Sequence, residues 1–95
     1  MAQSVTLPLE IEEETIEAIA SETRRALSKH GDHDKEHTDI LWTLIAGEEM
    51  GEINEAVLNC VDSRPGAEAH LDEELVQLVT VLVRWIQVRR QRVKP

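Results

Sequence analysis

Apolar residues recur at helical spacing in three segments of the chain, and polar stretches separate these segments. The segment at about residues 8–29 carries a thin apolar stripe, and the segment at about 39–59 carries a wide apolar arc. The segment at about 68–91 is apolar in nearly every direction around a helix. The pattern predicts three α-helices and an all-α fold, a helical bundle forming a single domain over residues 1–95.

Residues that favour helix ends mark the limits of these segments. Pro8 suits the first turn of the first helix, and Gly31 suits the left-handed conformation that often follows a helix. Thr38 or Asp39 suits the N-cap of the second helix. A turn-rich loop from Cys60 to Ala67 separates the second helix from the third.

The connector predicted at residues 30–37 is strongly polar. Its three histidines offer nitrogen ligands for zinc, but they lack the cysteines or the HExxH frame that is typical of zinc sites. A solvated loop is the favoured interpretation, with Lys35 as a candidate for contacting a bound phosphate. The histidines are His30, His33 and His37.

The third segment has more apolar surface than one short chain can cover. A helix that is apolar all round is buried on several sides, and two further helices from the same chain cannot easily enclose it. A chain of 95 residues also buries only a modest core by itself. We therefore expect a second subunit to complete the bundle, in a homodimer or homotetramer.

The charge of the chain is strongly and unevenly acidic. The formal net charge is −9; residues 84–95 contain five basic residues and no acid, while all nineteen acids lie in residues 1–83. An acidic chain is not expected to bind nucleic acid, because phosphate backbones need a basic surface. No apolar stretch is long enough to span a membrane. A single cysteine, Cys60, and no recognisable signal peptide predict a cytoplasmic protein.

Two clusters of acidic residues lie on the predicted second and third helices. Glu49 and Glu52 are three residues apart, so they project from one helix face, and Glu48 also neighbours Glu52. Glu49 and Glu52 fall within the apolar stripe, where a carboxylate needs a partner, a proton or a metal. The third helix offers Glu74 and Gln77 with the same spacing. If the two helices face each other, these side chains can surround a cation with oxygen atoms. Because Mg²⁺ prefers oxygen ligands, the spacing predicts a magnesium site.

The same residues resemble the motifs of a known family. Glu48-Glu49-x-x-Glu52, twenty-one intervening residues, and then Glu74-x-x-Gln77 are similar to the EExxE and ExxD motifs of the MazG-like, all-α nucleoside triphosphate pyrophosphohydrolases. The phrases LWTLIAGEEMGEINEAVL and EELVQLVTVLVRWIQ look like a short MazG-like subgroup that has Gln at the last position. The resemblance spans about residues 38–87.

The resemblance implies a fold, a reaction and roles for particular residues. The reaction is cleavage of a nucleoside triphosphate between the α and β phosphates, giving a monophosphate and pyrophosphate and removing unwanted nucleotides. Mg²⁺, or Mn²⁺ in its place, would be the cofactor, with Glu49, Glu52 and Glu74 as ligands. Glu48 would be a ligand or the general base, and Glu49 is the other catalytic candidate. Gln77 is a ligand candidate that brings an oxygen but no charge.

Several residues have alternative interpretations. Trp42 is a candidate for stacking on a nucleotide base or a core residue, and Arg84 is a candidate for binding phosphate or for pairing with an acidic helix. Gly51, in the middle of a helix, indicates a close helix contact or space for a ligand. The amide NH₂ of Gln77 cannot face a cation, so we expect it to point outward, to a neighbouring acid or phosphate. Because Gln77 replaces an Asp, a non-catalytic homologue that only oligomerises is the alternative function.

Overall fold

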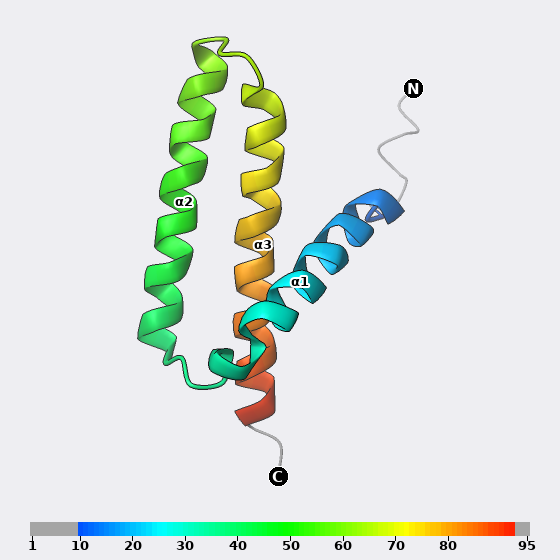
Figure 1. The fold of residues 1–95 in the computed structure, drawn as a ribbon, viewed down its shortest axis with the longest axis vertical. Helices are drawn as coiled ribbons and strands as arrows, with labels where there is room; N and C mark the ends of the chain where they lie inside the picture. Colours follow the sequence, from blue (N-terminus) through cyan, green and yellow to red (C-terminus); the bar gives the residue numbers. More distant parts are fainter. Residues whose placement is uncertain (1–9, 93–95) are drawn as a thin grey trace, which may run out of the picture.

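The computed structural model describes residues 10–92 and consists of three α-helices. They are α1 (Glu13–Asp34), α2 (Asp39–Val61) and α3 (Ala67–Arg92). Figure 1 shows α2 and α3 side by side and antiparallel, while α1 crosses the C-terminal half of α3 and slants away from it. The described residues contain no strand, which confirms the predicted all-α class.

The three helices do not enclose one another. Helix α3 packs against both α2 and α1, but α1 and α2 make no helix contact with each other. The radius of gyration is 16.4 Å, whereas a compact domain of this length has about 12 Å. The single chain therefore leaves much apolar surface uncovered.

The core lies between α2 and α3, at the end of the hairpin where α1 crosses. Trp42, Val81 and Val88 are buried there, and Ile45 and Trp85 pack against them. Helix α1 buries only Thr23, Ala26 and Asp34 along its whole length. No helix among the described residues combines the length and the apolar character that a membrane crossing requires.

The ends of α2 and α3 follow the sequence signals closely. The Thr38 hydroxyl accepts a hydrogen bond from the backbone N–H of Leu41 at 3.1 Å, so Thr38 is the N-cap of α2. In the turn before α3, Ser63 and Gly66 have positive φ angles of 53° and 76°. Glycine adopts this conformation without strain, which explains Gly66 at the last position of the turn.

Helix α1 differs from the prediction at both ends. The expected start at Pro8 lies outside the described residues, and residues 10–12 are not helical. The expected stop at Gly31 is wrong, because the helix continues through this glycine to Asp34. Asp34 is paired with Arg84 on α3, and this contact supports the extra turn. The connector is therefore residues 35–38, and not 30–37.

Candidate metal centre

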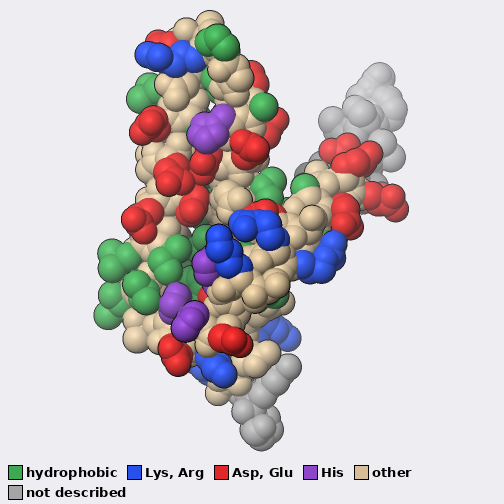
Figure 2. Space-filling view, in the orientation of Figure 1, with side chains coloured by type: hydrophobic (Ala, Val, Ile, Leu, Met, Phe, Trp, Pro, Cys, Tyr) green, Lys and Arg blue, Asp and Glu red, His purple; other side chains and the backbone are tan. Residues whose placement is uncertain are grey.

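Three carboxylates from two helices meet on the α2–α3 hairpin. One ligand oxygen each from Glu49, Glu52 and Glu74 lies within 4.8 Å of the others. The i, i+3 spacing puts Glu49 and Glu52 on one face of α2, and the antiparallel packing of α3 brings Glu74 opposite them. Figure 2 shows acidic side chains gathered over α2 and the adjoining part of α3. Within residues 10–92, no other group of His, Cys, Asp or Glu side chains converges in this way.

The cluster favours the protonated forms of Glu49 and Glu74. Burial, together with the nearby carboxylates of Glu52 and Glu74, raises the pKa of Glu49 to about 7. Burial and the carboxylate of Glu52 likewise raise the pKa of Glu74 above its ordinary value. Desolvation and like charges both disfavour the ionised form. At neutral pH the three groups therefore repel one another unless a proton or a cation joins them.

Two oxygen atoms of the cluster have unsatisfied hydrogen-bonding capacity. Glu49 Oε2 and Glu74 Oε2 are fully buried and have no hydrogen-bond partner among the described residues. A buried carboxylate oxygen without a partner is unfavourable. Carboxylate oxygens that converge from facing helices fit a hard divalent cation such as Mg²⁺ or Mn²⁺. The three histidines near the end of α1 form no such group.

A histidine that the sequence patterns did not bring to attention lies beside the cluster. His70 Nε2 is 3.6 Å from Glu74 Oε1, and His70 Nδ1 is 3.7 Å from Glu73 Oε1. His70, Glu52 and Glu74 line one hollow of about 370 Å³ between α2 and α3. The i, i+4 spacing of His70 and Glu74 is the sequence feature that could have identified this contact. A protonated His70 would offset part of the negative charge at this edge of the cluster.

Gln77 contacts α1 at the edge of the site. Its Nε2 donates a hydrogen bond of 2.8 Å to Glu22 Oε2, so the NH₂ group faces a neighbouring acid, as amide chemistry predicted. Glu22 also pairs with Arg25, and the hydrogen bonds from Arg25 and Gln77 hold the pKa of Glu22 below its ordinary value despite partial burial. Sequence reasoning missed Glu22, because the two residues are 55 positions apart.

The remaining residues of the EExxE motif are open to solvent. Glu48 is exposed and lies outside the group of three converging carboxylates. A Cβ atom added at Gly51 would meet no atom within 4 Å. A close helix contact therefore does not explain this glycine, and the surface beside the cluster is open at that point.

The three candidate substrate-binding residues lie away from the carboxylates. Trp42 is completely buried in the core, so the structure supports its interpretation as a core residue. Arg84 lies over the Trp42 ring, 5.4 Å from its centroid, and pairs with Asp34 through bonds of 2.9 and 2.7 Å. Lys35 lines the same hollow as Arg84. Arg84 lies ten positions after Glu74, which corresponds to about 15 Å along α3.

Comparisons of the chain with known protein families, with curated proteins and with solved structures found no match.

Proposed function

We propose that this protein is a Mg²⁺-dependent nucleoside triphosphate pyrophosphohydrolase of the MazG-like type. It would cleave ribo- or deoxyribonucleoside triphosphates to monophosphates and pyrophosphate, and so remove unwanted nucleotides. The observation that carries the proposal is the convergence of Glu49, Glu52 and Glu74 within 4.8 Å, with two buried oxygens that lack partners. The EExxE and ExxQ motifs contribute the reaction class by resemblance.

Glu49, Glu52 and Glu74 would hold the cation. Bound Mg²⁺ or Mn²⁺ supplies charge neutralisation for the phosphates and makes bound water more acidic. Gln77 supports this site from its edge, because its NH₂ group is already committed to Glu22. The exposed carboxylate of Glu48 is the candidate general base, since it lies next to the cluster in sequence but is not one of the three converging groups.

A homodimer or homotetramer is part of the proposal. Large apolar side chains remain exposed on both helices of the hairpin, and Figure 2 shows many apolar side chains gathered over the first turns of α2. Ile40 and Leu44 on α2 are 75% and 62% exposed, and Ile86 on α3 is 55% exposed. A second copy covering this surface would remove it from water.

A second candidate function is that of a non-catalytic oligomeric interaction protein. Two observations favour it: the exposed apolar surface, and the use of Gln77 as a link between α3 and α1. In this alternative the bundle and its self-association are retained while turnover is lost.

Pyrophosphate release from a panel of common, deoxy and damaged nucleoside triphosphates tests the proposal. We expect release with Mg²⁺ or Mn²⁺, none with EDTA, and loss of activity in Glu49→Gln and Glu74→Gln. Glu73→Gln is the matched control, because it removes a neighbouring charge whose side chain is 76% exposed, and it should retain activity. Absence of release from every nucleotide by the metal-loaded parent would refute the hydrolase and favour the interaction protein.

A further inference from the structure

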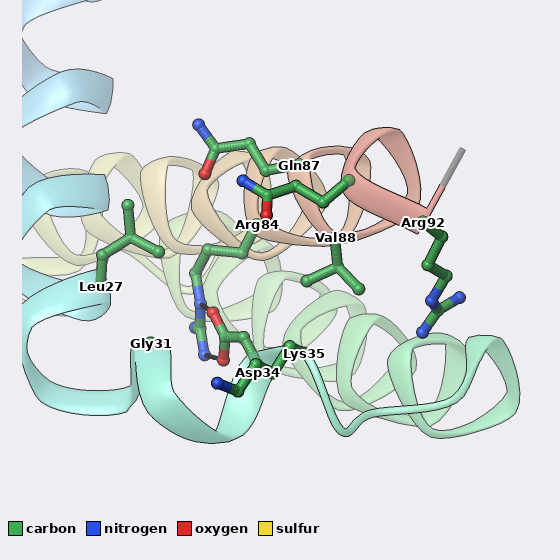
Figure 3. Close-up of a pocket in the computed structure, with 9 residues that line it drawn as sticks. Leu27, Gly31, Asp34, Lys35, Arg84, Gln87, Val88 and Arg92 are labelled. Atoms are coloured by element: carbon green, nitrogen blue, oxygen red, sulfur yellow. Dashed lines mark hydrogen bonds and ion pairs between the residues drawn. The ribbon is translucent and has the colours of Figure 1, made fainter. Parts of the chain in front are cut away.

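A second hollow lies where the end of α1 meets the last turns of α3. It has a volume of about 350 Å³, at the lower end of the range for small-molecule sites. Leu27, Gly31 and Val88 contribute apolar surface, while Gln87 and Gln91 contribute amide groups. Figure 3 shows Leu27 and Gly31 of α1 and Gln87 and Val88 of α3 around the space.

The charged residues of this hollow are nearly all basic. Lys35, Arg84 and Arg92 line it, and Asp34 is the one acid among the lining residues. The Asp34 side chain is only 3% exposed and pairs with Arg84, so these two charges offset each other, and the lining residues together carry a net charge of +2. Since the whole chain carries a net charge of −9, this cationic hollow stands apart from the rest of the surface.

The two arginines of the hollow are held in place by contacts within the chain. Arg84 donates hydrogen bonds from Nε and Nη2 to the two carboxylate oxygens of Asp34. Because a guanidinium carries five N–H donors, the two on Nη1 are left for a ligand. Arg92 is fixed by hydrogen bonds to the Asp39 carboxylate and to the His37 carbonyl oxygen. Lys35 is exposed at the rim and makes no ion pair among the described residues. The fixed position of Arg84 lowers the entropic cost of binding an anion.

We infer that this hollow is a binding site for a small phosphate-bearing anion, separate from the carboxylate cluster. Arg84 and Lys35 provide charge-assisted donors for the phosphate oxygens, the glutamine amides add neutral donors, and the apolar wall accepts a compact organic part. The site requires no metal, and it does not depend on the proposed hydrolase. Arg84 is about 15 Å along α3 from Glu74, so one phosphate group cannot contact both.

The test is an amide NMR titration of the full chain in EDTA with pyrophosphate, inorganic phosphate and a nucleoside monophosphate. Potassium chloride at matched ionic strength is the reference. We expect saturable shifts around Gly31, Lys35 and Gln91, complete below about 10 mM ligand, with little change around Glu49. Tighter binding of the nucleoside monophosphate than of inorganic phosphate would identify an organic phosphate as the ligand, and equal binding would identify the free anion.

Matched variants separate a built site from general charge attraction. Lys35→Gln and Gln91→Glu should each weaken binding at least about tenfold, a difference of about 1.4 kcal/mol. Lys29→Gln removes the same charge from an exposed position on α1 that does not line the hollow, so it should change binding less than about twofold. Equal losses in Lys35→Gln and Lys29→Gln, or shifts that never saturate, would overturn the inference.

Discussion

Replacing Glu49 by Gln should stabilise the metal-free protein above neutral pH. The pKa of Glu49 is about 7 in the folded protein, against an ordinary value of 4.5. Between these two values the folded state binds the proton more strongly than the unfolded chain does, so the free energy of unfolding falls as pH rises. The favourable contribution is fully present below about pH 4.5 and is lost as pH passes through about 7. Glutamine does not ionise in this pH range, so the free energy of unfolding of the variant does not fall in this way.

The magnitude follows from the difference between the two pKa values. A rise in the pKa of Glu49 from 4.5 to about 7 corresponds to about 3 kcal/mol of folding free energy, because each pKa unit is worth about 1.36 kcal/mol. The cluster is partly exposed through Glu52, and solvent screening reduces the expected gain to about 1–2 kcal/mol. For a domain of this size, that gain raises the Tm by about 5–10 °C.

The assay is thermal unfolding of parent and variant in EDTA from pH 4.5 to pH 8.5, at one protein concentration. The difference in Tm should be small at pH 4.5 and should grow through pH 7, while Glu73→Gln should follow the parent. Adding Mg²⁺ at pH 8 should raise the Tm of the parent more than that of Glu49→Gln, because a cation that binds only the folded state stabilises it by mass action. A constant Tm difference across this pH range would refute the reasoning about the cluster.

Two further predictions concern the contacts between helices, and a third concerns the oligomeric state. Gln77→Ala should lower the free energy of unfolding, measured by chemical denaturation, by about 1–2 kcal/mol, because it loses the hydrogen bond to α1. The control Gln87→Ala, at an exposed position, should have the same free energy of unfolding as the parent. Asp34→Asn and Arg84→Met should each lower the free energy of unfolding by about 3 kcal/mol, because each leaves a buried charge unpaired. The double variant Asp34→Leu with Arg84→Met should recover at least half of that stability, and additive losses would contradict this account. Sedimentation of the parent should give at least twice the 10.8 kDa monomer mass, and Leu44→Glu should shift the protein towards monomer; a folded monomeric parent would exclude the oligomer.

Local sequence signals predicted the parts of the fold that depend on neighbouring residues. The apolar periodicity located all three helices, and Thr38 was among the two residues expected to cap α2. The i, i+3 spacing of Glu49 and Glu52 correctly indicated that they share a face, and Glu74 lies opposite them. Such features depend on backbone geometry over one or two turns, which the sequence specifies directly.

Features that depend on distant residues were not predictable from the same patterns. Gly31 is usually a sign of a helix end, but the helix continues to Asp34, whose partner Arg84 is 50 positions away. The association of Gln77 with Glu22 and the position of Lys35 beside Arg84 likewise require knowledge of how α1 crosses α3. At Gly31 a tertiary contact overrode the local preference, and the other two features have no local signal.

The way in which α1 is attached has a consequence for folding order and local opening. Helices α2 and α3 are joined by a short turn and pack along their lengths, so the contacts nearest the turn close small loops, and we expect the hairpin to form early. Helix α1 is attached through pairs such as Glu22 with Gln77 and Asp34 with Arg84, which are 55 and 50 positions apart. We therefore expect α1 to dock late and to detach as a separate cooperative unit before the hairpin unfolds. Each detachment frees the amide of Gln77 and the guanidinium of Arg84, so the edge of the carboxylate cluster and the cationic hollow loosen together.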